Sequence, residues 1–302
     1  MSNSVLFAAV VLIWGSTWLA ITFQFGEIDP ILSVGLRFTL AAIILGLFCW
    51  FKKLSLKLPA HIHVKMAAAG LCLYTLDYCL LYQSQQYIIS AIVAVMSSCM
   101  VYINVILRRV LLKKPMRPEV LIGATCGMVG IALIFLPEFS RVRADHLLLL
   151  GIGLALISFF FASLGNVISE RILDHGTPVI QMNFWAMSYG VVFILAYALY
   201  QGIEWRLPTR GAYYLSILYL SVFGSVLAFG AYMKLVRQMG SDKSAYVVLV
   251  YPIVALILST LFEGYQWHIE ALIGVVVVLL GNGIAMGKIP LPALKANNTQ
   301  QR

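Results

Sequence analysis

Two ionisable side chains lie deep inside apolar stretches of this chain. Arg37 follows Pro30 by seven residues, and Asp77 lies seven residues before Ser84, where its own apolar stretch ends. At 1.5 Å per helical residue, both lie about 10 Å below the same membrane face. Because an isolated charge is costly in hydrocarbon, this spacing favours a pair between them, or contact with a substrate or a proton in a cavity. For Arg37 we favour a structural role, since an arginine at this depth can reach the end of its span.

Aromatic and amide side chains could supply the rest of a binding cavity. Trp14 and Trp18 share one helix face, and Tyr78 and Tyr82 form an i, i+4 stripe beside Asp77. Amide and indole groups at mid-depth are disfavoured against lipid, so we expect them to face other helices, either lining a cavity or joining the helices. The deep candidates in later stretches are Asn104, Asn166, Tyr232 and Tyr251.

Pro252 interrupts the apolar stretch 244–262. It removes one helical hydrogen bond and frees a carbonyl near Val248 or Leu249, so it could act as a hinge, expose backbone to a substrate, or simply bend the helix. The small-residue pairs Gly123/Gly127 and Gly283/Gly287 favour close helix contacts, either inside the molecule or between two copies. A monomer and a homodimer are both compatible with this pattern.

The composition identifies the class of protein. Of the 302 residues, 61% are hydrophobic and 11% are charged, whereas a soluble domain has about 25% charged residues. The net charge of +9 comes from basic residues in short loops, so it predicts no nucleic-acid partner. The sequence contains no nucleotide-binding loop, hydrolase or metal motif, and a single intramembrane carboxylate is too little for acid–base catalysis. We therefore expect an integral membrane protein that is not an enzyme, with no cofactor or metal.

Ten apolar stretches are long enough to cross a bilayer, which requires about 20 residues each. Sixteen Lys and Arg residues fall on the side of the N-terminus and four on the other side, which predicts cytoplasmic N- and C-termini. We expect residues 289–302 to form a disordered cytoplasmic tail. The predicted spans are 4–24, 30–51, 66–84, 88–110, 119–136, 147–168, 178–200, 212–233, 244–262 and 269–287.

An internal repeat divides the chain. Residues 119–123 (EVLIG) match residues 270–274 (EALIG), and Gly130 matches Gly281, all at an offset of 151 residues. The repeats are predicted at 1–138 and 147–288, with five spans each. A unit with an odd number of spans inserts its second copy upside down, so the predicted fold is all-α, with ten transmembrane helices in two inverted five-helix repeats.

Several short motifs together resemble the EamA-type branch of the drug/metabolite transporter superfamily. They are Ile13-Trp14-Gly15-Ser16, Leu36-Arg37-Phe38, Pro252, Phe262-Glu263, Leu272-Ile273-Gly274 and Gly281. The first half departs from the pattern, because its fourth span lacks the proline and Leu112 stands where the final hairpin has Glu263. The resemblance implies a multi-pass carrier of the bacterial inner membrane that exports amino acids and related metabolites. It also implies a cavity lined by Trp14, Trp18, Tyr78, Tyr82, Asn104, Asn166, Tyr232 and Tyr251, with Asp77 nearby.

The leading hypothesis is a secondary exporter of amino acids or related small amphipathic metabolites, working by alternating access in the lipid bilayer. An extension couples transport to protons through Asp77. The alternative is a translocator of nucleotide sugars or lipid-linked precursors, but phosphates would favour several basic groups in the cavity, and the core offers Arg37 alone. A membrane receptor would need larger extramembrane surfaces than these loops supply.

Overall fold

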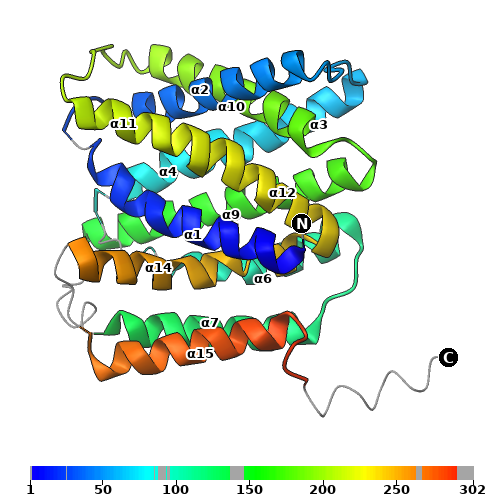
Figure 1. Cartoon of the computed structure of the whole chain (residues 1–302), viewed down its shortest axis with the longest axis vertical. Helices are drawn as coiled ribbons and strands as arrows, with labels where there is room; N and C mark the ends of the chain where they lie inside the picture. Colours follow the sequence, from blue (N-terminus) through cyan, green and yellow to red (C-terminus); the bar gives the residue numbers. More distant parts are fainter. Residues whose placement is uncertain are drawn as a thin grey trace.

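The computed structural model describes residues 2–24, 26–84, 86–87, 93, 96–136, 146–262 and 267–290, and all the regular structure among them is helical. Long helices pack side by side in a bundle (Figure 1). The predicted tail lies outside the described residues from position 291 onward. The all-helical prediction is confirmed.

The first half of the bundle begins with two long helices, α1 (Asn3–Thr22) and α2 (Pro30–Phe51). The Asp29 carboxylate caps α2 by accepting the Ile31 N–H at 2.8 Å, and Pro30 occupies the first turn. The helices that follow are α3 (Ala60–Gly70), the π-helical η1 (Leu71–Leu76), α4 (Asp77–Ser84), α6 (Cys99–Leu112) and α7 (Pro118–Ile134).

The second half repeats this order. Its first helix is α9 (His146–Asp174), which extends six residues beyond the span predicted to end at 168. Gly240 ends α12 with φ of 92°, a conformation that favours glycine. The remaining elements are α10 (Val179–Tyr200), α11 (Gly211–Tyr219), the π-helical η2 (Leu220–Leu227), α12 (Ala228–Met239), α13 (Ser241–Ser244), α14 (Val247–Phe262) and α15 (Ile269–Ala285).

Length and composition suit these helices to a bilayer. Seven of the described helical stretches are long and apolar enough to cross a membrane, and α7 and α15 are shorter apolar helices of 17 residues each. Many of their outward-facing side chains are large and hydrophobic, as expected for surfaces that contact lipid. The described helices therefore support a multi-pass membrane protein.

The last helices of the two halves pack against each other through glycine. A Cβ on Gly281 would lie 2.6 Å from the carbonyl oxygen of Gly123, and one on Gly130 would lie 2.6 Å from that of Gly274. These contacts make α7 and α15 antiparallel, and Figure 1 shows the two helices side by side at one edge of the bundle. At the 151-residue offset, Gly123 matches Gly274 and Gly130 matches Gly281, so each of these two contacts is the repeat equivalent of the other. A two-fold axis between two copies of one unit produces this relation. Gly123 and its neighbour Gly127, which faces Leu249, thus serve packing inside the molecule.

Both halves also contain a π-helical interruption at matching positions. At the 151-residue offset, η1 corresponds to 222–227, which lies within η2. π-helical turns are rare and occur frequently at functional sites. The occurrence of π-helical turns at matching positions of both halves suggests that a functional site lies near η1 and η2.

Candidate functional site

A cavity of about 140 Å³ lies inside the bundle, between helices from both halves. Its walls come from α1, α2, η1, α4, α6, α9, α12 and α14, and they are mainly aromatic and aliphatic. The lining residues are Trp14, Thr17, Ile21, Arg37, Leu73, Asp77, Tyr78, Leu81, Tyr82, Ser97, Met100, Phe159, Ala162, Asn166, Phe229, Tyr232, Val248 and Tyr251.

Matching positions of the two halves meet at this cavity. Four pairs of lining residues are separated by the 151-residue offset that also relates the glycine contacts of α7 and α15. The cavity is therefore framed in register by both repeats, which is where inverted-repeat transporters bind their cargo. The pairs are Tyr78/Phe229, Leu81/Tyr232, Ser97/Val248 and Met100/Tyr251.

Most of the predicted binding residues line this cavity. Arg37, for which a structural role was favoured, lines it as well. The side chain of Trp18 lies outside the described part of the structure. The predicted residues that the cavity brings together are Trp14, Asp77, Tyr78, Tyr82, Asn166, Tyr232 and Tyr251.

Two predicted residues are not among the lining residues. Asn104 is fully buried on α6, where its Nδ2 donates to the Met100 carbonyl at 2.8 Å and lies 3.5 Å from the Ser163 hydroxyl on α9. Its place is thus between two helices. Pro252 is inside α14, next to the lining residue Tyr251. A Cβ on Gly15 would lie 2.9 Å from the Tyr251 carbonyl oxygen, so α1 passes close to the backbone beside this proline.

An aromatic cluster forms one wall. The ring of Trp14 lies 5.1 Å from those of Phe229 and Tyr232, measured between centroids. Its indole Nε1 donates to the carbonyl oxygen of Gly224 at 3.1 Å, so the polar end of the indole is bound to the backbone of η2. The apolar ring is left to contact other groups.

The two intramembrane charges share the cavity without pairing. Arg37 Nε donates to the Ser225 hydroxyl at 2.9 Å, and Asp77 accepts a hydrogen bond from the Ser158 hydroxyl at 2.6 Å. None of the ion pairs among the described residues joins Arg37 to Asp77. Of the alternatives left open by their equal depth, the pair is not formed, because each charge has a hydroxyl partner on a different helix of the second half.

Asn166 adds a polar atom whose hydrogen-bonding capacity is unused in the described structure. It is 2% exposed, and its Oδ1 is buried without a hydrogen-bond partner. Such an atom costs about 1–3 kcal/mol until a donor reaches it. Asn166 also lines the cavity, so a ligand with an N–H or O–H group could supply that donor.

Sequence reasoning missed a buried ionic cluster at one end of the bundle. Glu170 is 1% exposed; its Oε1 lies 2.9 Å from Arg108 Nε and 2.8 Å from Lys114 Nζ. Its Oε2 accepts hydrogen bonds from the Ser241 N–H and hydroxyl, and Arg108 also lies 3.2 Å from Asp242. Basic groups of the first half thus hold acidic groups of the second.

The cluster was missed because Arg37 and Asp77 alone were considered as ionisable groups inside the membrane. Arg108 fell inside the predicted span 88–110 but was counted with the basic residues of the N-terminal side, and the span containing Asn166 was ended at 168, two residues before Glu170. The available signal was the spacing of Glu170, four residues after Asn166, which places it one helical turn further along the same face. Lys114 lies at the edge of the cluster. Partial burial lowers the pKa of its amine, but the hydrogen bonds to Asp174 and Glu170 have the larger combined effect and raise this pKa above its usual value.

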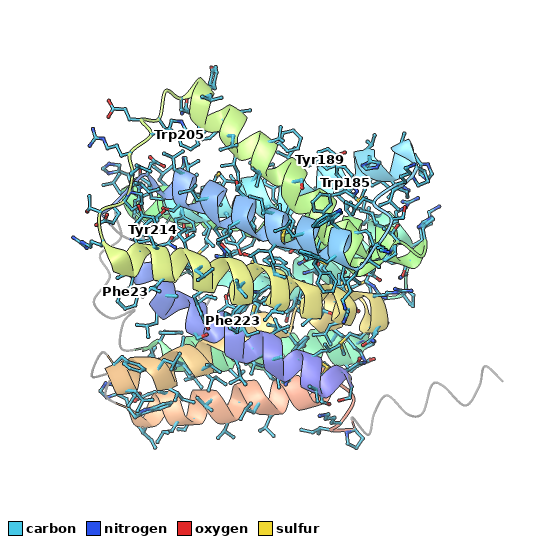
Figure 2. The ribbon with its side chains drawn as sticks, turned by 45° about the horizontal axis from the view of Figure 1, so that its top comes forward. Phe23, Trp185, Tyr189, Trp205, Tyr214 and Phe223 are labelled. Atoms are coloured by element: carbon cyan, nitrogen blue, oxygen red, sulfur yellow. The ribbon has the colours of Figure 1, made fainter. Side chains whose placement is uncertain are left out.

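Other aromatic side chains lie away from the cavity. Figure 2 places Trp185 toward one end of the bundle and Trp205 and Tyr214 toward the other, as expected for side chains at the two interfaces of a bilayer. Trp185 Nε1 donates to the Leu56 carbonyl at 3.0 Å. Tyr213, next to Tyr214, is instead buried, with its hydroxyl 2.9 Å from that of Ser33.

Comparison with known proteins identifies the family. The model of the EamA-like transporter family matches residues 1–136 and 149–286, so this chain belongs to that family of drug/metabolite transporters. A solved crystal structure matches its fold with a TM-score of 0.76 at 15% identity, covering 94% of this chain and 96% of the other.

Curated relatives match nearly the whole chain. The uncharacterized inner membrane transporter YedA of Escherichia coli (strain K12) is 27% identical over 293 residues, covering 94% of this chain and 91% of that protein. A probable amino-acid metabolite efflux pump of Salmonella typhimurium is 21% identical over 280 residues and covers 90% of each chain. Both similarities extend across the two repeats.

Proposed function

We propose that this chain is a secondary transporter of the bacterial inner membrane that exports amino acids or related small amphipathic metabolites by alternating access. The observation that carries the proposal is the cavity, which both repeats frame in register and which holds Arg37 and Asp77 without an ion pair between them. A zwitterionic or amphipathic molecule suits such a mixture of aromatic rings, amide and opposite charges. The similarity to a probable amino-acid metabolite efflux pump supports the same substrate class.

The proposed topology has ten spans in two inverted repeats, with both termini in the cytoplasm. The antiparallel contact between α7 and α15 supports the inversion, and the excess of Lys and Arg supports the orientation. In this orientation the cluster around Glu170 lies at the cytoplasmic end. It ties the two halves together there, so rocking of the halves toward the cytoplasm would have to break it.

Two lining positions have proposed roles in the transport cycle. Asp77 is the candidate proton-coupling group, because it is the carboxylate among the described lining residues. Pro252 is the candidate hinge, since α1 passes close to the neighbouring carbonyl of Tyr251 and a proline leaves α14 with one hydrogen bond fewer.

Thermal stabilisation by ligands tests the substrate class. The detergent-purified protein is heated with a panel of amino acids and nucleotide sugars, and binding to the folded state raises Tm. We expect amino acids to raise Tm in the wild-type protein and in Trp205→Ala, which alters an exposed ring, but not in Trp14→Ala, which removes part of the cavity wall. Stabilisation by phosphorylated compounds alone would contradict the proposal and favour the nucleotide-sugar translocator.

A further inference from the structure

We propose that Arg37 binds the carboxylate of the transported substrate, so that the site requires an anionic group on its ligand. This inference rests on the proposed function and names the group by which one end of the substrate is recognised. It replaces the structural role that depth in the membrane alone suggested for this arginine.

Arg37 is buried without a counter-charge among the described residues. Its exposed fraction is 3%, and its Nε donates to the neutral hydroxyl of Ser225. Among the described residues no carboxylate lies within ion-pair distance of the guanidinium. A buried cation is stable when an anion approaches it, and Arg37 lines the cavity through which one could do so.

The surroundings hold the guanidinium in place without neutralising it. Its Cζ lies 5.3 Å from the ring centroids of both Phe38 and Tyr78, a cation–π arrangement. A Cβ on Gly224 would lie 3.1 Å from Nη2, so the group lies against the backbone of η2. The Gly224 carbonyl oxygen already accepts the indole N–H of Trp14.

In the second half of the molecule, the matching helix contact is made without an arginine. The Ser221 hydroxyl donates a hydrogen bond to the Arg37 backbone carbonyl at 3.0 Å. Gly70 matches Ser221 at the 151-residue offset. It lies against the backbone carbonyl of Ala186, which a Cβ on Gly70 would meet. Arg37 and Ala186 are each the eighth residue of a 22-residue helix; these helices, α2 and α10, begin 149 residues apart, two fewer than the offset between Gly70 and Ser221. The equivalent contact is therefore made with alanine in the second half, so this packing does not require arginine.

The chemistry of the lining favours a carboxylate over a larger anion. Arg37 is the one basic residue among the described lining residues, and a guanidinium matches a carboxylate with two parallel hydrogen bonds. A pyrophosphate would leave charge unneutralised in a wall that is otherwise aromatic and aliphatic. A single carboxylate balances the single cation.

The test compares an amino acid with its carboxamide, which has lost the anionic group. Both compounds compete against the labelled amino acid in counterflow by proteoliposomes containing the full chain, either wild type, Arg37→Gln or Ser225→Ala. We expect the wild-type protein to prefer the acid about 10- to 100-fold, the range that a charged hydrogen bond supplies. Arg37→Gln should bind both compounds equally, whereas Ser225→Ala, which keeps the guanidinium, should retain most of the preference.

Each outcome decides the inference. If Arg37→Gln weakens binding of the acid and the amide equally, so that the variant keeps the wild-type preference for the acid, the inference is overturned and Arg37 has a structural role. If Arg37→Gln does not fold, Arg37→Lys keeps the charge but not the two-pronged geometry, and it should lose several-fold of the preference; an unchanged ratio would contradict the inference. Absence of counterflow with every amino acid in the wild-type protein would instead refute the proposed function, and the carboxylate site with it.

Discussion

Replacement of Glu170 by alanine is expected to lower the free energy of unfolding by about 3–5 kcal/mol, because it removes one partner of a buried ion pair with Arg108 and leaves the Ser241 N–H and hydroxyl without their acceptor. Glu170 is 1% exposed and accepts hydrogen bonds from Arg108, Lys114 and Ser241, which come from both halves of the chain. Arg108 would retain Asp242 at 3.2 Å as its remaining partner. The loss should appear as a clear decrease of Tm in detergent.

Asp174→Ala provides the matched control. Asp174 lies 2.6 Å from the same Lys114, but the two side chains are 39% and 31% exposed. An ion pair of this kind contributes at most about 1 kcal/mol, so Tm should change little. Equal destabilisation by the two substitutions would show that burial of the cluster does not determine its contribution.

Replacement of Asp77 by asparagine is expected to abolish accumulation of substrate driven by a pH gradient while exchange of substrate across the membrane continues. Asparagine preserves the size of the side chain and an oxygen that can accept a hydrogen bond from the Ser158 hydroxyl, but it cannot bind and release a proton. Uptake into proteoliposomes, with and without a pH gradient, separates the two activities.

Ser158→Ala is the control for this experiment. It removes the hydrogen bond to Asp77 Oδ1 and leaves the carboxylate in place, so gradient-driven transport should persist. Undiminished uphill transport by Asp77→Asn would exclude Asp77 as the coupling group. Loss of exchange as well as uphill transport would assign it to substrate binding or packing instead.

The sequence predicts the helical class and the repeat because both depend on local composition and on spacing along the chain. The offset between the Glu119 and Glu270 motifs also relates residues that line the cavity from the two halves, such as Leu81 and Tyr232. Tyr78 and Tyr82 could likewise be selected from their helical spacing beside Asp77.

What the sequence could not decide is the rotation of each helix about its axis. Asn104 and Asn166 are both deep amides, yet the first joins α6 to α9 and the second lines the cavity. Equal depth suggested that Arg37 and Asp77 would pair, but depth does not specify the neighbouring helix, and each charge meets a different hydroxyl. The Glu170 cluster depends on three helix ends meeting; the spacing from Asn166 places Glu170 on the same helix face but does not specify which basic groups reach it.

Substrate is expected to pass through the cavity framed by both repeats, and blocking this cavity tests that passage most directly. Ala162 lines the cavity and is 3% exposed, so Ala162→Trp would fill the space, whereas tryptophan in place of the exposed Leu215 would leave the cavity unchanged. Counterflow of a labelled amino acid is measured in proteoliposomes containing each folded variant. We expect transport by the wild type and Leu215→Trp, and none by Ala162→Trp. Full transport by Ala162→Trp would contradict the account.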